Sequence, residues 1–218
     1  MIERSVKIKI KKYHCQVFLI INKKLIGGYY LKIITFASIK IKIMAKQKVV
    51  LVDKDDNTLG TMEKMAAHEN GSLHRAFSIF VFNSNKELMI HQRALSKYHS
   101  PGLWTNTCCS HPRINEDVEE NAHQRLMEEM GFDCPLQKAF TFLYKADVGQ
   151  GLIEHEYDHV FIGTSDIQPK INPEEVEAWK YVNMEDLRTD IENNEQNYTE
   201  WFKIAFEKVE DWLAGNPL

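Results

Sequence analysis

One amphipathic helix pattern, set among strand-like runs, most constrains what this chain can fold into. Between residues 117 and 130 the apolar side chains recur at helical spacing and form one face, made of Val118, Ala122, Leu126 and Met130. Gly131 follows at once, and glycine often ends a helix because it adopts the left-handed conformation without strain. Such a helix must bury its apolar face against other elements, so the neighbouring segments decide the fold class.

Those segments are predicted from short apolar runs bounded by turn residues. We expect strands at residues 48–53, 74–82, 87–93, 138–147, 154–164 and 179–182, and further helical segments at residues 63–68, 184–191 and 198–213. Strands interspersed with helices, without a repeat, predict an α/β (α+β) fold. The expected domain is single and compact, spans residues 45–218, and holds a mixed β-sheet between helices.

Charge separates the first 44 residues from the rest. Residues 1–44 hold ten Lys/Arg and one acid (net +9), whereas the remainder holds 17 Lys/Arg and 30 Asp/Glu (net −13). The acidic remainder disfavours nucleic acid as a partner. The apolar run at residues 17–21 is too short for a membrane span, which takes about 20 apolar residues. We expect residues 1–44 to be a disordered or wrongly included upstream extension; a membrane-surface or targeting arm is the alternative.

The cysteines show no disulfide-scaffold spacing. They are Cys15, Cys108, Cys109 and Cys134, and the adjacent pair cannot easily bridge. Free thiols are typical of a reducing compartment, so we expect a cytoplasmic protein.

Two pairs of reactive side chains occur at i, i+2 spacing. Cys109 precedes His111, and Glu154 precedes Glu156. In an extended segment each pair shares one face, because strand side chains alternate. The polar context of Cys109 predicts a thiol of lowered pKa. A buried, inert cysteine is the alternative, and that is the role we expect for Cys108 on the opposite face.

Histidines and carboxylates could together form a metal site. The candidate ligands are His68, His74, His111, Glu154 and Glu156. Neighbouring carboxylates repel unless a cation or proton lies between them, and raised pKa values follow. Nitrogen and oxygen donors suit Zn²⁺, Mn²⁺ or Fe²⁺, and Mg²⁺ less exclusively. The alternative is that each histidine is an unrelated surface or hydrogen-bonded residue.

Arg93 and Lys97 lie at i, i+4 spacing and share one side of a turn or helix. Such a pair can clamp a phosphate or diphosphate. A solvated basic face is the alternative.

The helix also carries a partial family motif. Glu128-Glu129-Met130-Gly131-Phe132 matches the tail of the Nudix box, G-x5-E-x7-R-E-U-x-E-E-x-G-U, and Glu116 falls on its first glutamate. Ser110 stands where the box has Gly, and Gln124-Arg125 stands where it has Arg-Glu. Nudix hydrolases use the box glutamates to hold Mg²⁺ against a diphosphate. With Arg125 in place of one glutamate, the site is suited to gripping a diphosphate without cutting it.

Taken in order, the motifs of residues 46–215 resemble the type 1 isopentenyl-diphosphate Δ-isomerases, on the Nudix fold. The resemblance rests on Ala66-Ala67-His68, Leu73-His74-Arg75-Ala76-Phe77, Arg93-Ala94-Leu95-Ser96-Lys97, residues 101–112, Glu128-Glu129-Met130-Gly131, Tyr144 and Glu154-His155-Glu156. It implies a monomeric isomerase of isoprenoid precursor synthesis that converts isopentenyl diphosphate to dimethylallyl diphosphate. An unactivated alkene is a poor base, so this reaction needs two proton-transfer groups facing each other across an apolar pocket.

The resemblance implies that Cys109 and Glu156 carry the protons on opposite faces of the substrate and that Tyr144 orients Glu156. Glu156 also ligates one divalent ion (Mn²⁺, Mg²⁺ or Zn²⁺) with His68, His74, His111 and Glu154. A second ion, Mg²⁺ at Glu129, bridges to the diphosphate.

The implied diphosphate contacts are Lys64, Arg93, Lys97 and Arg125. Trp201 offers a π face to the cationic intermediate, or is a core aromatic residue. Water must be kept from the cation, and Phe77, Trp104 and the C-terminal helix are candidates for closing the pocket. Two functions compete with this one: a Nudix-type diphosphate hydrolase, and a non-catalytic metal-binding protein on the same fold.

Overall fold

The structure, a computed structural model, describes residues 17–22, 30–35 and 47–218, in two units divided after Gln47. In the first unit, β1 (Val17–Asn22) pairs antiparallel with β2 (Tyr30–Thr35). The other residues up to 46 lie outside the described part. The expectation that residues 1–44 form a disordered or wrongly included extension therefore stays a prediction.

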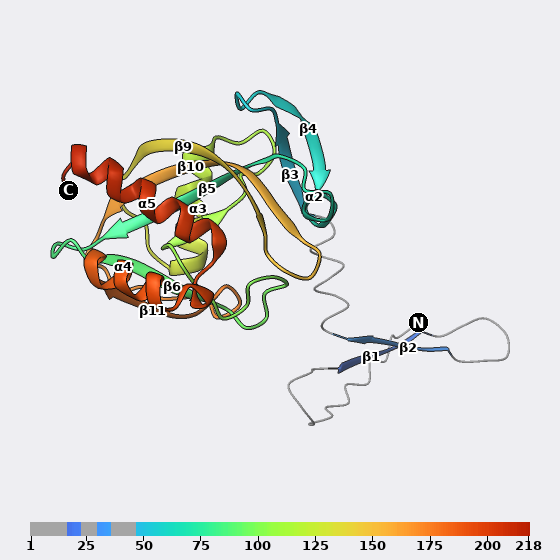
Figure 1. The fold of residues 1–218 in the computed structure, drawn as a ribbon. Helices are drawn as coiled ribbons and strands as arrows, with labels where there is room; N and C mark the ends of the chain where they lie inside the picture. Colours follow the sequence, from blue (N-terminus) through green and yellow to red (C-terminus); the bar gives the residue numbers. More distant parts are fainter. Residues whose placement is uncertain (1–16, 23–29, 36–46) are drawn as a thin grey trace. The chain divides into compact units, whose positions relative to one another are not determined.

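The second unit is built on a nine-stranded mixed sheet with the central order β11-β6-β5-β10-β9 (Figure 1). Its strands are β3 (Lys48–Val52), β4 (Thr58–Glu63), β5 (His74–Phe82), β6 (Leu88–Arg93), β7 (Trp104–Thr105), β8 (Cys108–Ser110), β9 (Leu136–Asp147), β10 (Ile153–Thr164) and β11 (Val176–Val182). Strands β5 and β10 run parallel, and the other ladders of the sheet are antiparallel. The ladder of β8 along β5 brings the cysteine segment beside the parallel pair.

Helices cover both faces of this sheet. They are α2 (Lys64–Asn70), α3 (Val118–Met130), α4 (Met184–Asn193) and α5 (Glu200–Gly215), with a short 3-10 turn, η1 (Glu195–Asn197), before α5. On one face Phe80 packs with Phe202 of α5, and on the other Ile79 packs with Leu126 of α3. Fully burying one such side chain stabilises the fold by about 1.5–3 kcal/mol. The predicted fold class, a mixed sheet between helices, is confirmed.

Helix α3 begins and ends where the sequence predicts. The Asp117 side chain accepts hydrogen bonds from the backbone N–H groups of Glu119 (2.8 Å) and Glu120 (3.1 Å). Gly131 ends the helix at φ 73°, in the left-handed region. A Cβ atom there would lie 2.4 Å from the backbone oxygen of Lys170, so glycine is required by space as well as by conformation.

Two expectations about strands need correction. Strand β4 was not expected from the sequence: it pairs with β3 alone among the described strands, and its Leu59 is 68% exposed, so no buried face marks it. Phe77 is fully buried in the cluster under α3 and therefore faces away from Phe80 and α5. It is not placed to close a pocket on the α5 face.

Among the described residues, no helix is both long and apolar enough to cross a membrane.

Candidate active site

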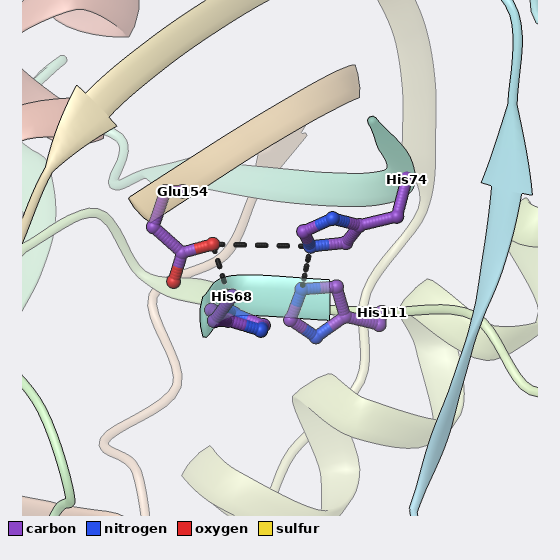
Figure 2. A group of neighbouring side chains, drawn as sticks. All are labelled: His68, His74, His111 and Glu154. Carbon is purple, nitrogen blue, oxygen red and sulfur yellow. Dashed lines mark hydrogen bonds and ion pairs between the residues drawn. The ribbon is translucent and has the colours of Figure 1, made fainter. Parts of the chain in front are cut away.

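Four side chains from separate elements meet at the N-terminal ends of the parallel strands β5 and β10. His68 lies on α2, His74 begins β5, His111 follows β8, and Glu154 is the second residue of β10. Their ligand atoms all lie within 4.8 Å of one another, and Figure 2 shows the side chains pointing toward a common centre. We call these four residues the ligand cluster.

Backbone hydrogen bonds hold the outer ring nitrogens of His68 and His74, so that their Nε2 atoms face the centre, where His74 Nε2 lies 3.1 Å from His111 Nε2. The Nδ1 atoms of His68 and His74 donate to the backbone oxygens of Lys64 (2.6 Å) and Ser72 (2.8 Å). A neutral imidazole has one N–H, so both Nε2 atoms present lone pairs to the centre. His68 Nε2 and Glu154 Oε2, 3.0 Å apart, are buried without a hydrogen-bond partner among the described residues. Three imidazole nitrogens and a carboxylate oxygen therefore fit a divalent metal ion.

Glu156 lies beside the ligand cluster, and its two carboxylate oxygens contact different partners. Oε1 is 2.8 Å from His111 Nε2 and 3.5 Å from His74 Nε2, whereas Oε2 accepts a 2.5 Å hydrogen bond from the Tyr144 hydroxyl. Burial raises the pKa of Tyr144 well above its ordinary value, and the charge of Glu156 adds to the shift. The phenol thus keeps its proton and donates it in the hydrogen bond.

The expected rise in the carboxylate pKa values is wrong. Burial does act to raise the pKa of Glu156, but contacts with His74 and Tyr144 outweigh it and bring the pKa to about 2. Burial and the charge of Glu156 likewise act to raise the pKa of Glu154, but the rings of His68 and His99 lower it to about 2. Nitrogen partners on each carboxylate compensate the repulsion, which spacing alone could not reveal.

Cys109 lies on β8 opposite Ser78 of β5 and packs against the core on the α5 face. Burial raises the pKa of its thiol to about 12; the charge of Arg93 opposes this shift and that of Glu156 adds to it. The expectation of a lowered thiol pKa is therefore wrong, and Cys109 carries its proton at neutral pH. Cys108 is fully buried in the cluster under α3, on the other face of the sheet.

Two of the predicted basic residues, Lys97 and Arg125, are paired with carboxylates. Both Lys97 and Arg125 form ion pairs with Glu175, and for Arg125 the distance from Nη2 to Oε1 is 3.6 Å. Arg125 also pairs with Glu129, the expected Mg²⁺ ligand. Burial lowers the pKa of Lys64; the charge of Glu154 opposes this shift, and those of Lys97 and Arg93 add to it.

Arg93 and Trp201 form a second part of the site. The Arg93 guanidinium donates to the backbone oxygens of His99 and Ser100, both at 3.1 Å. Its carbon lies 5.0 Å from the ring centre of Trp201, within cation–π range. Trp201 is also buried among the apolar residues on the α5 face, and its indole N–H has no hydrogen-bond partner among the described residues. The structure thus shows Trp201 packed in the core, and its role toward a cationic intermediate stays a prediction.

Sequence reasoning missed two contributors to the site. His99 contacts Glu154, with 3.0 Å from its Nε2 atom to Oε1. Glu175 bridges two of the predicted diphosphate ligands. Both lie in connecting segments, outside any strand or helix. No periodic pattern or spacing relates such positions to the site.

Comparison with known proteins identifies the class to which this fold and site belong. Residues 72–202 match the NUDIX domain, so the chain belongs to the Nudix family. Solved structures with the same fold include DR0079 from Deinococcus radiodurans (TM-score 0.58, 19% identity, covering 68% of this chain and 90% of that one). A MutT protein from Methanosarcina mazei Go1 has a TM-score of 0.54 at 15% identity and covers 67% of this chain and 96% of that one.

Closer relatives narrow the class to one group. The chain is 51% identical over 164 residues to isopentenyl-diphosphate Delta-isomerase 2 of Aromatoleum aromaticum, covering 75% of this chain and 87% of that protein. It is 52% identical over 169 residues to isopentenyl-diphosphate Delta-isomerase 2 of Photorhabdus laumondii, covering 75% of this chain and 96% of that protein. The chain belongs to the isopentenyl-diphosphate Delta-isomerase family.

Proposed function

We propose that this enzyme interconverts isopentenyl diphosphate and dimethylallyl diphosphate by a 1,3-allylic proton shift. The observation that most supports it is the position of Glu156. One carboxylate oxygen of Glu156 accepts a hydrogen bond from the Tyr144 phenol, and the other faces two histidines of the ligand cluster. A carboxylate held in this way has a fixed orientation, which proton transfer to or from carbon requires.

The protonation states of Cys109 and Glu156 suit a shift that moves one proton. The thiol is neutral and the carboxylate is ionised, so the pair holds a single transferable proton. One group adds a proton to the terminal methylene carbon of isopentenyl diphosphate, and the double bond electrons form the new C–H bond. The other group removes a proton from the methylene carbon on the far side of the cation, which restores a double bond. The two groups then exchange protons with solvent and return to their starting states.

The residues proposed to hold the divalent ion (Mn²⁺, Mg²⁺ or Zn²⁺) are His68, His74, His111, Glu154 and Glu156. Glu129 is the proposed ligand of a diphosphate-bound Mg²⁺. When bound, these ions would fix the orientation of Glu156 and offset the diphosphate charge. The chain itself supplies the diphosphate contacts through Lys64, Arg93, Lys97 and Arg125, and Trp201 presents its ring to the cation.

The test is proton NMR of isopentenyl diphosphate incubated in D₂O with the enzyme, Mg²⁺ and Mn²⁺. We expect dimethylallyl signals and deuterium incorporation with the wild type, and neither with Cys109→Ala or Glu156→Gln. Release of phosphate or diphosphate without isomerisation would instead support a Nudix-type hydrolase. An active Cys109→Ala variant would contradict the proposed role of the thiol.

We further propose a monomer that works in the cytoplasm, with residues 1–43 dispensable for catalysis. Among the described residues, Cys108, Cys109 and Cys134 are free thiols, which suits a reducing compartment. Gel filtration tests the monomer, cell fractionation tests the location, and a chain beginning at Met44 should isomerise as fast as the full chain.

A further inference from the structure

His99 lies against the ligand cluster and has no role in the reaction described above. It belongs to the loop between β6 and β7, yet only 4% of it is exposed. Its Nε2 atom is 3.0 Å from Glu154 Oε1, while Glu154 Oε2 is 3.0 Å from His68 Nε2. The two oxygens of Glu154 therefore face different partners, one in the ligand cluster and one in the loop.

The contact determines which nitrogen of His99 carries the proton. An ionised carboxylate only accepts hydrogen bonds, so the nitrogen facing Glu154 must be the donor. The other ring nitrogen, Nδ1, lies 3.4 Å from the Ser100 hydroxyl, which can donate to it. A neutral imidazole with its N–H on Nε2 satisfies both contacts, and the ring then holds Glu154 Oε1 away from the ligand cluster.

The position of this ring is fixed from several sides. It stacks on His68 with 6.0 Å between ring centres and meets Trp201 edge-on at 5.8 Å. The Tyr98 ring lies 4.3 Å away, also edge-on. The backbone oxygen of His99 accepts a 3.1 Å hydrogen bond from the Arg93 guanidinium. His99 thus joins a metal-ligand candidate to a diphosphate-ligand candidate through one loop.

We propose that His99 is a positioning residue that holds Glu154 with Oε2 turned into the ligand cluster, so that the cluster is preorganised for its ion. The inference rests on the proposed function only for the assignment of Glu154 as a metal ligand. Hydrogen-bond partners of metal ligands orient them, and losing one typically weakens metal binding about 10- to 100-fold. Without the N–H of His99, Glu154 Oε1 would be buried without a donor and the carboxylate could rotate.

The test is calorimetric titration of Mn²⁺ into the metal-free full-length protein. His99→Phe keeps a ring between His68 and Trp201 but lacks the donor, and His99→Gln keeps an N–H donor. His99→Phe should raise the Kd for Mn²⁺ about 10- to 100-fold, whereas His99→Gln should keep most of the wild-type affinity. His123→Phe is the matched control: His123 lies on α3, outside the site, and pairs with Asp133 (2.6 Å), so its loss should leave the Kd unchanged.

Circular dichroism of the metal-free variants establishes that they are folded, and His99→Ala replaces His99→Phe if the latter is not. A wild-type Kd in the donor-less variant would overturn the proposal. Equal weakening in His99→Phe and His99→Gln would also overturn it, because a packing role alone would then account for the loss. The isomerase assay on the same preparations separates the two hypotheses. A wild type that binds Mn²⁺ but does not isomerise refutes the proposed function, while the Kd comparison still decides the role of His99.

Discussion

Replacing Tyr144 by phenylalanine removes one oxygen atom and leaves the ring in place. The lost contact is the 2.5 Å hydrogen bond to Glu156 Oε2, in which a neutral phenol donates to a buried carboxylate. A hydrogen bond to a charged group contributes about 1.5–3 kcal/mol. If the bond holds Glu156 in its reactive orientation through the transition state, kcat falls roughly 10- to 150-fold. KM should change little, because Tyr144 is not among the proposed diphosphate contacts.

The same variant should change the pH dependence of kcat. The hydrogen bond from Tyr144 helps to keep the pKa of Glu156 low, at about 2, so its loss raises that pKa. A rise in pKa means that ionised Glu156 is lost at a higher pH, and the acidic limb of kcat moves upward. Dimethylallyl diphosphate formation, followed by NMR across the pH range, measures both effects.

The matched control is Tyr157→Phe, which removes a hydroxyl 3.1 Å from Thr141 Oγ1. Tyr157 directly follows Glu156 on β10, so its side chain lies on the other face of that strand. It should retain the wild-type kcat and pH profile. A wild-type kcat with an unshifted acidic limb in Tyr144→Phe would refute the argument that this bond orients Glu156.

Three further predictions follow from other contacts. Glu175→Gln keeps the side-chain shape but removes the charge that pairs with its two cations, so we expect substrate KM to fall up to about fivefold, because a partly exposed ion pair contributes about 1 kcal/mol; a higher KM would mean that Glu175 positions those cations. Gly131→Ala should lower the free energy of unfolding in urea by more than about 2 kcal/mol, because the left-handed conformation costs about 1–2 kcal/mol and the new methyl group meets the Lys170 oxygen. The control is Gly149→Ala, at φ 83° with nothing within 4 Å, which should lower the free energy of unfolding only by the conformational cost. Chelation should abolish isomerisation and lower the melting temperature by about 5–10 °C relative to protein with metal at 100 times its Kd; an unchanged melting curve and full activity in chelator would contradict the metal site.

Several features of this protein follow from local sequence. Helix α3 has an apolar face at helical spacing, a capping Asp117 and a terminal Gly131, all within 15 consecutive residues. The alternation of a strand likewise places Glu154 and Glu156 on one face of β10 before any partner strand is known. The conditional prediction for Cys109 has the same basis, and β8 is indeed extended there. Such features depend on neighbours along the chain, and the chain order alone carries them.

The direction in which the β5 side chains face and the pKa values of the site residues depend on packing between distant segments. The apolar run of β5 continues on both faces, so its pattern could not show that Phe77 packs under α3 rather than over the pocket. The pKa of Cys109 depends on burial and on charged residues distant in sequence, among which Arg93 lowers it and Glu129 and Glu156 raise it. Burial disfavours the charged thiolate, and this effect outweighs the polar sequence context from which a lowered thiol pKa was expected.

The sequence by itself determined the family, the helices and most strands, and the residue types available for chemistry. Only the tertiary structure decided which of them meet. The parallel register of β5 and β10 pairs His74 with Glu156 across 82 positions of chain, and the loop after β6 carries His99 onto Glu154. Periodicity reports how a residue relates to its near neighbours, whereas contacts between distant segments depend on register, burial and packing of the whole sheet.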